Sequence, residues 1–228
     1  MKIAVIGATG ATGTKVVERA LELGHEVIAV ARRPELISAA ARLTSRKGDV
    51  MNIDSVAKAI AGAEAVITCI GPTSTFAQGA GNSKGVLNAV AANLSPGSVM
   101  SLGIPNVLAA CQRAGVKRLV MQSGIGLSDG KELSFSNRLT LSVHRRIFTK
   151  AVKDKAIAES EVQRSSLEWV IVRPPGMKEG PATRTYTAGP WARIAAFQQI
   201  SFADCADSLV RAAASEPTWV RKIVNVGR

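Results

Sequence analysis

Three glycines near the start of the chain have the spacing of a phosphate-binding loop. Gly7, Gly10 and Gly13 follow the apolar run 3–6 and precede a helical pattern over 14–23. A strand that turns sharply into a helix leaves the first N–H groups of the helix unpaired, and these donors suit a pyrophosphate. Glycine allows the close backbone approach and the positive φ that such a turn requires. The motif predicts a dinucleotide site, and the alternative is a tight turn without a ligand.

The residues after the second apolar run indicate which dinucleotide to expect. An NAD site usually has Asp or Glu there, to accept a hydrogen bond from the ribose 2′-hydroxyl. Here Arg32 and Arg33 follow the run 26–31, and the first carboxylate is Glu35. Two guanidinium groups suit a 2′-phosphate. We therefore expect NADP(H) to be preferred over NAD(H); two solvated arginines on a surface loop are the alternative.

The elements that must position these residues alternate between strand and helix along the whole chain. No linker, repeat or low-complexity segment divides them, as a doubly wound parallel sheet requires. Asp54 is the expected N-cap of one helix, and Gly24 and Gly115 mark helix ends. We expect strands near residues 2–6, 26–30, 45–49, 65–70, 117–122, 168–172 and 222–226. We expect helices near residues 12–23, 54–61, 98–114, 150–165 and 203–214.

The fold class predicted by this alternation is α/β, a single Rossmann-type domain over residues 1–228 with a small C-terminal region on the substrate side. Residues 72–97 depart from the pattern, because they are rich in Gly, Ser, Thr and Asn. They follow the fourth strand, at the sheet edge where such folds bind ligands. The segment is interpreted as a lid or insertion, or equally as a surface excursion or a subunit contact.

Composition excludes several classes of protein. No apolar run approaches the roughly 20 residues that a membrane-spanning helix needs. The chain enters a strand at its start, so we expect no signal peptide and a cytoplasmic protein. Cys69, Cys111 and Cys205 are scattered and form no C-x-x-C pair, so we expect a reducing compartment and no metal site.

The net charge of +12 raises the question of a polyanionic partner. The basic residues are spread out, and aromatic residues make up only 4% of the chain, so a stacking platform for single strands is not expected. A basic solvated surface is the default interpretation, followed by an anionic cofactor with an anionic substrate. Nucleic-acid binding is a third and less favoured one.

Over nearly its whole length the chain resembles the short-chain dehydrogenase/reductase superfamily, in its atypical NAD(P)-binding branch. The glycine loop is similar to that family's cofactor loop, and Gln122-Ser123-Gly124 to the strand that carries its active-site serine. Within the branch, the chain is most similar to the biliverdin reductase B/flavin reductase group and to NmrA-like proteins. The resemblance implies cofactor contacts from Gly7, Thr9, Gly10, Ala11, Thr12, Gly13, Asp49, Val50, Cys69, Ile70, Gly71, Ser123, Pro174, Pro175 and Gly176.

The resemblance also implies catalytic residues, with one departure. The best-known branch of the superfamily uses Tyr-x-x-x-Lys, in which the tyrosine supplies a proton. Here Ala151 stands four residues before Lys155, and Tyr186 is the only tyrosine, so that mechanism is disfavoured. We expect Ser123, Lys155 and Tyr186 to be catalytic, and Arg184 with Tyr186 to contact the substrate. The alternatives are a strand-end hydroxyl for Ser123 and a solvated helix lysine for Lys155.

The chemistry that needs no protein acid is hydride transfer to a conjugated acceptor. A flavin, quinone or linear tetrapyrrole delocalises the added charge, and water can supply the proton. We therefore expect an NADPH-dependent reductase of such an acceptor. The positive net charge of the chain favours an acceptor that is anionic. The alternative is a non-catalytic NADP(H)-binding redox sensor of the NmrA-like type. By resemblance, the protein is expected to be a monomer or a weak homo-oligomer.

Overall fold

The computed structural model describes residues 1–71, 98–128, 149–194 and 198–228. Its strands are β1 (Lys2–Ile6), β2 (Glu26–Ala31), β3 (Leu43–Lys47), β4 (Ala65–Thr68), β5 (Arg118–Gln122), β6 (Glu168–Arg173), β7 (Met177–Lys178), β8 (Thr187–Gly189), β9 (Ile200–Ser201) and β10 (Lys222–Gly227). Its helices are α1 (Ala11–Glu22), α2 (Ile53–Ile60), α4 (Val99–Arg113), α6 (Thr149–Arg164) and α7 (Phe202–Ala214). Short 3-10 turns lie at Pro34–Leu36, Ile125–Leu127 and Pro217–Trp219.

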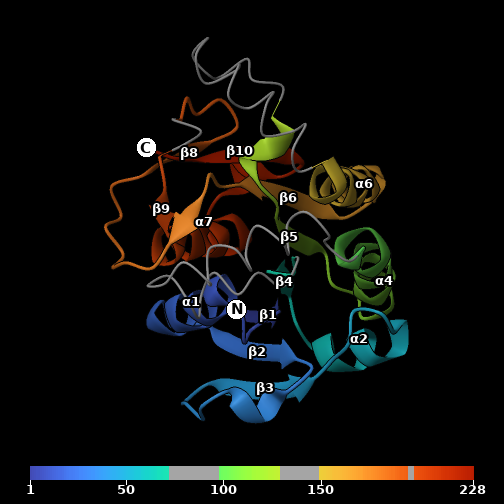
Figure 1. The fold of residues 1–228 in the computed structure, drawn as a ribbon. Coiled ribbons are helices and arrows are strands. Elements are labelled where there is room, and N and C mark those ends of the chain that lie inside the picture. Colours follow the sequence, from blue (N-terminus) through green and yellow to red (C-terminus); the bar gives the residue numbers. More distant parts are fainter. Residues whose placement is uncertain (72–97, 129–148, 195–197) are drawn as a thin grey trace, which may run out of the picture.

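Within these residues, eight strands form one twisted sheet in the order β3-β2-β1-β4-β5-β6-β10-β8 (Figure 1). All neighbouring pairs are parallel except β10 and β8, which run antiparallel. The chain builds outward from β1 to β3 and then crosses back to β4, so the strand order reverses between β1 and β4. Ligands bind beyond the carboxyl ends of the strands at such a reversal. The predicted Rossmann-type fold is confirmed.

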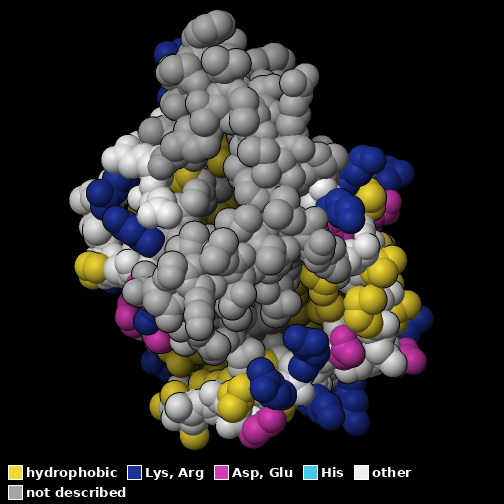
Figure 2. All heavy atoms as spheres, viewed as in Figure 1, with side chains coloured by type: hydrophobic (Ala, Val, Ile, Leu, Met, Phe, Trp, Pro, Cys, Tyr) yellow, Lys and Arg dark blue, Asp and Glu magenta, His cyan; other side chains and the backbone are white. Residues whose placement is uncertain are grey.

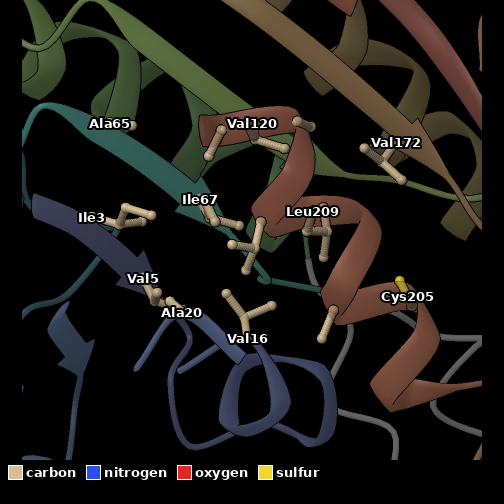
Figure 3. Close-up of a cluster of buried hydrophobic side chains, with 14 of the residues drawn as sticks. Ile3, Val5, Val16, Ala20, Ala65, Ile67, Val120, Val172, Cys205 and Leu209 are labelled. Carbon is tan, nitrogen blue, oxygen red and sulfur yellow. The ribbon is translucent and has the colours of Figure 1, made fainter. Parts of the chain in front are cut away.

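Helices cover both faces of the sheet: α1 and α7 lie on one side, and α2, α4 and α6 on the other (Figure 1). Because successive strand residues point to opposite faces, Ile3 and Val5 enter the first core and Ala4 and Ile6 the second. Strands buried on both faces read as continuous apolar runs. Figure 3 shows the first core, where side chains of α1 and α7 meet those of the sheet.

Most expected elements are confirmed to within two residues, and the differences are local. Gly24 and Gly115 adopt positive φ at the ends of α1 and α4, as expected (φ 84° and 69°). The N-cap of α2 is Asn52, whose side chain accepts a hydrogen bond from Ser55 N at 2.9 Å, so the prediction of Asp54 was wrong. Asp54 lies in the first turn and pairs with Arg113 at 2.7 Å.

Three short strands, β7, β8 and β9, were not expected from the sequence. β7 and β9 pair with each other in a separate parallel ladder. The interpretation of residues 72–97 as a lid or insertion concerns a segment outside the described residues. No described helix is long and apolar enough to span a membrane.

Candidate functional site

Two glycines of the loop, Gly7 and Gly13, are packed so closely that a Cβ does not fit there. Gly7 has a φ of 84°, and a Cβ there would lie 2.8 Å from the carbonyl oxygen of Cys69. A Cβ on Gly13 would lie only 2.1 Å from the carbonyl oxygen of Gly7. The loop is also tied to β2, because Gly7 N donates to Val30 O at 3.0 Å. These contacts fix the backbone where β1 passes into α1.

The amino end of α1 suits an anion. Its N-cap, Gly10, has extended backbone dihedral angles and contributes no capping side chain. The first turn of the helix contains no acidic residue. The amide groups of Ala11 and Thr12 therefore meet no carboxylate of the helix's own first turn, and the helix dipole adds a partial positive charge. Thr9 and Gly10 are exposed beside them. This arrangement fits the pyrophosphate of a dinucleotide.

A pocket of about 660 Å³ lies between the carboxyl ends of β2 and β3 and the helix α2. It is lined by Arg32, Arg46, Lys47, Gly48, Asp49, Ser55, Lys58 and Ala59. Figure 2 shows Lys and Arg side chains gathered on this part of the surface, over β3 and α2. Four cations and one carboxylate thus line one hollow, and Arg33 is not among the lining residues. The residues present fit a phosphate group.

The cations of this pocket differ in how they are held. Arg46 donates to the carbonyl oxygens of Ala59 and Ala61, at 3.0 and 2.8 Å, so its guanidinium closes the carboxyl end of α2. Arg32, Lys47 and Lys58 are exposed, and no ion pair within the described residues includes them. These three side chains have their charges available for a ligand. The sequence predicted only Arg32 among them.

The turn at Asp49 and Val50, two of the expected cofactor contacts, is held by local hydrogen bonds. The Asp49 carboxylate accepts from Met51 N at 3.0 Å, and Asp49 N donates to Ser55 Oγ at 3.1 Å. Val50 is half-buried and packs against the second core. The turn after β3 therefore places Asp49 in the pocket wall.

The turn after β4 packs against the glycine loop. Cys69 N donates to Ile6 O at 2.9 Å, which sets Cys69, Ile70 and Gly71 beside β1. Burial raises the pKa of the Cys69 thiol to about 12. The thiol is therefore protonated near neutral pH and is not a nucleophile there.

Ser123 and Lys155 are brought together at the carboxyl end of β5. Ser123 is buried, and its Oγ has no hydrogen-bond partner within the described residues. Lys155 reaches across from α6, and its Nζ lies 3.2 Å from the position of a Cβ on Gly124, the residue after Ser123. Burial lowers the pKa of Lys155, while Glu159 and Asp154 oppose that change. A hydroxyl without a hydrogen-bond partner in the described residues and the half-buried amine of Lys155 thus lie at adjacent residues of this sheet edge.

The loop 174–176, which holds three of the expected cofactor contacts, adjoins the carboxyl end of β5. Pro174 O accepts a hydrogen bond from Ile125 N at 2.9 Å, which joins the loop to the turn after Ser123. Gly176 O accepts from Ile200 N at 3.1 Å. Pro174 therefore lies beside the turn that follows Ser123.

Tyr186 is not part of this group, which corrects the catalytic and substrate roles expected for it. Its ring packs against the first core, on the α1 and α7 face, whereas Lys155 belongs to α6 on the opposite face. Its hydroxyl donates to Asp207, which also binds Arg19 at 2.6 Å. Burial, and then the bond to Asp207, raise the pKa of Tyr186 above its ordinary value. Tyr186 is a donor within a structural network, and its proton is held there.

The Arg184 side chain also lies away from the position expected for a substrate contact. Its backbone N donates to Asp204 at 2.8 Å, and its side chain lies 3.5 Å from Glu22 at the end of α1. The residue adopts a φ of 54° to make that turn. The expected contact between Arg184 and a substrate at the Ser123 corner is therefore not supported by its position.

Comparison with known proteins agrees with the geometry. The model of a family described as NAD(P)H-binding matches residues 7–216. The chain belongs to this family. It is similar to an uncharacterized chloroplastic protein of Arabidopsis thaliana, at 28% identity over 189 residues. That match covers 83% of this chain and 64% of the relative.

A second curated relative is an enzyme by its name. The 3-beta-hydroxysteroid dehydrogenase of Mycolicibacterium neoaurum is 28% identical over 167 residues, which are 71% of this chain and 42% of that protein. The chain therefore spans less than two thirds of the length of either relative.

Solved structures share the fold of this chain at low sequence identity. A short-chain dehydrogenase/reductase of Veillonella parvula in complex with NADP gives a TM-score of 0.73 at 19% identity, covering 100% of this chain and 94% of that one. The anaerobillin reductase ChuY of Escherichia coli O157:H7 gives 0.73 at 21% identity, with 100% and 97% covered. The expected NAD(P)-binding family and its Rossmann-type fold are thereby confirmed.

Proposed function

We propose that this family member is an NADPH-dependent reductase that transfers hydride to a conjugated acceptor such as a flavin, a quinone or a linear tetrapyrrole. The observation that carries the proposal is the carboxyl end of β5, where the Ser123 hydroxyl has no hydrogen-bond partner within the described residues and Lys155 lies against the next residue, Gly124. Ala151 lies one turn before Lys155 in α6, buried, where a methyl group stands in place of a phenolic acid. A site with donors but no tyrosine suits an acceptor whose charge is delocalised.

The residues of the chain have separable roles in this proposal. When bound, the nicotinamide supplies the hydride. The amino end of α1 binds the phosphates, and the turn at Asp49 borders the adenosine. Ser123 and Lys155 donate hydrogen bonds to the acceptor and hold it against the nicotinamide side of the site. Their position favours an acceptor with anionic or carbonyl groups.

The preference for NADPH over NADH is part of the same proposal. Arg32, Lys47 and Lys58 converge on the pocket at the ends of β2 and β3, and their charges are available. Three cations from three elements favour a dianionic 2′-phosphate over a hydroxyl. The sole carboxylate of the pocket, Asp49, is already an acceptor for Met51 N.

The test is acceptor-dependent oxidation of NADPH, measured beside NADH against FMN, riboflavin, biliverdin and small quinones. The fold shared with an anaerobillin reductase is a reason to include bilins. We expect turnover that prefers NADPH and a loss of that preference in the Arg32→Ala/Arg33→Ala double variant. Lys117→Gln is the matched control, because Lys117 is an exposed cation at the amino edge of the sheet.

NADPH binding without turnover of any acceptor would reject the reductase and favour the redox sensor. In that case oxidised and reduced cofactor would be compared for their effect on binding to a protein partner. Turnover with equal use of NADH would leave the reductase in place and reject the phosphate pocket.

A further inference from the structure

Gln122, the last residue of β5, has an amide group that is only partly satisfied. Its Nε2 lies 3.8 Å from Met177 Sδ, which is a weak contact. Its Oε1 is buried and has no hydrogen-bond partner within the described residues. A buried amide oxygen without a partner is unfavourable in the free protein, so its retention points to a donor that arrives with a ligand.

The position of Gln122 links it to the phosphate end of the site. Gln122 and Val120 share one face of β5, and Val120 belongs to the core beneath α1 and α7. The Met177 sulfur that contacts Gln122 also lies 4.0 Å from Thr12 Oγ1, in the first turn of α1. Met177 directly follows the loop Pro174–Gly176, which adjoins Ser123. Gln122 therefore stands between the amino end of α1 and the Ser123 corner.

The chemistry of the unpaired atom restricts what can bind there. With the amide in the orientation that the structure shows, Oε1 only accepts hydrogen bonds, so an ionised phosphate oxygen cannot satisfy it. The adenine amino group belongs at the Asp49 side of the site. A nicotinamide that extends from α1 toward Ser123 carries a carboxamide N–H2, which is a donor. The last torsion of a glutamine side chain is broad, and the sulfur contact that holds the amide is long, so a small rotation can bring Oε1 to such a donor.

We propose that Gln122 is a positioning residue for the cofactor, whose Oε1 accepts a hydrogen bond from the carboxamide N–H2 of the bound nicotinamide. The contact fixes which face of the nicotinamide ring is turned toward Ser123 and the acceptor. The inference depends on the dinucleotide binding of the family and not on the acceptor, so it is independent of whether the chain turns any acceptor over.

The test compares two ligands on the variant Gln122→Met, an apolar side chain of similar length. The ligands are NADPH and 2′-phospho-ADP-ribose, which is the cofactor without its nicotinamide. We expect Kd for NADPH to rise about three- to tenfold, the loss of one hydrogen bond, and Kd for 2′-phospho-ADP-ribose to stay unchanged. Unfolding of the ligand-free variant should need the same or more denaturant, because an unpaired polar group has been removed.

Gln163→Met is the matched control, since Gln163 is exposed on α6 and should leave both Kd values unchanged. Equal weakening of both ligands by Gln122→Met, or no weakening of either, would overturn the proposal. If Gln122→Met does not fold, Gln122→Glu decides, because it keeps an acceptor oxygen. Selective weakening of NADPH by Gln122→Glu would then overturn the proposed direction of the hydrogen bond, and retained affinity for NADPH would support it.

Discussion

Glu159 and Arg173 form a two-point ion pair between α6 and the end of β6. Arg173 Nε lies 3.0 Å from Glu159 Oε1, and Nη2 lies 2.5 Å from Oε2. The Glu159 side chain is buried, and the Arg173 side chain is mostly covered. The pair holds α6 against the strand that leads into Pro174, and Lys155 lies one turn before Glu159 on the same helix. It thereby sets the distance between Lys155 and the turn at Gly124.

Removing Arg173 should cost more stability than removing both charges. Arg173→Ala leaves the Glu159 carboxylate buried and unpaired, so we expect the free energy of unfolding to fall by about 3–5 kcal/mol. The double variant Arg173→Met/Glu159→Leu should recover most of that loss. Denaturant unfolding of the two variants checks this, and a double variant as unstable as the single one would contradict the account.

Lys155 should make the stability of the protein depend on pH at alkaline values. Burial lowers its pKa in the folded protein below the ordinary value of 10.5, so folding disfavours the charged form. Lys155→Met should therefore be the more stable protein near neutral pH. As pH rises from the folded pKa toward 10.5, the unfolded chain keeps the proton that the folded one has lost, and the wild type gains stability. Unfolding free energies over a pH series should show the two proteins converge; Lys153→Met, at an exposed position of α6, is the control.

Gly13→Ala should damage both the fold and cofactor binding. The new Cβ would lie 2.1 Å from the carbonyl oxygen of Gly7, so the loop must shift. We expect a loss of about 3 kcal/mol in the free energy of unfolding and no measurable NADPH binding. Gly189→Ala is the matched change, because a Cβ there meets nothing within 4 Å. NADPH titration is the readout, and wild-type affinity in Gly13→Ala would be incompatible with the packed loop.

Lys58→Ala should reduce affinity for NADPH and not for NADH. Its ammonium lines the pocket with Arg32 and Lys47 and has no ion-pair partner within the described residues. We expect Kd for NADPH to rise about three- to tenfold at low salt, with a smaller change at high salt because exposed charges are screened. Arg33→Ala should have less effect than Arg32→Ala, since Arg33 does not line the pocket. Equal losses for the two dinucleotides would place Lys58 outside the 2′-phosphate site.

Tyr186→Phe separates a structural role from a catalytic one. The change removes the hydroxyl that donates to Asp207, so we expect about 1–2 kcal/mol less stability. Because the hydroxyl lies on the α1 and α7 face, kcat/KM should stay within about twofold of the wild type. A fall of kcat/KM by orders of magnitude in a folded variant would restore Tyr186 to the active site.

The sequence predicted the features that depend on neighbouring residues in the chain. Parallel strands buried on both faces are apolar runs, so β1 and β2 could be placed almost to the residue. The glycine loop could be found because its close packing requires glycine at fixed spacing. Asn52 could have been preferred as the N-cap of α2 from its spacing to Ser55, since both Asn and Asp cap well.

Contacts between distant segments could not be predicted in this way. Tyr186 meets Asp207, and Arg173 meets Glu159, only because strands and helices stack in the folded chain. The two-residue strands β7 and β9 have no periodicity to detect. Lys58 reads as an ordinary polar residue of an amphipathic helix, and no local signal shows that its helix turns it toward Arg32.

The two margins of the sheet differ from its interior in a way that bears on self-association. β3 at one margin carries Arg46 and Lys47, and β8 at the other spans three residues and runs against its neighbour. A second copy laid along β3 would bring cations opposite cations, and the chain as a whole carries a charge of +12. A second copy laid along β8 would find too few backbone groups for a stable ladder. The same lysines and arginines that suit a phosphate therefore also disfavour edge-to-edge aggregation along β3.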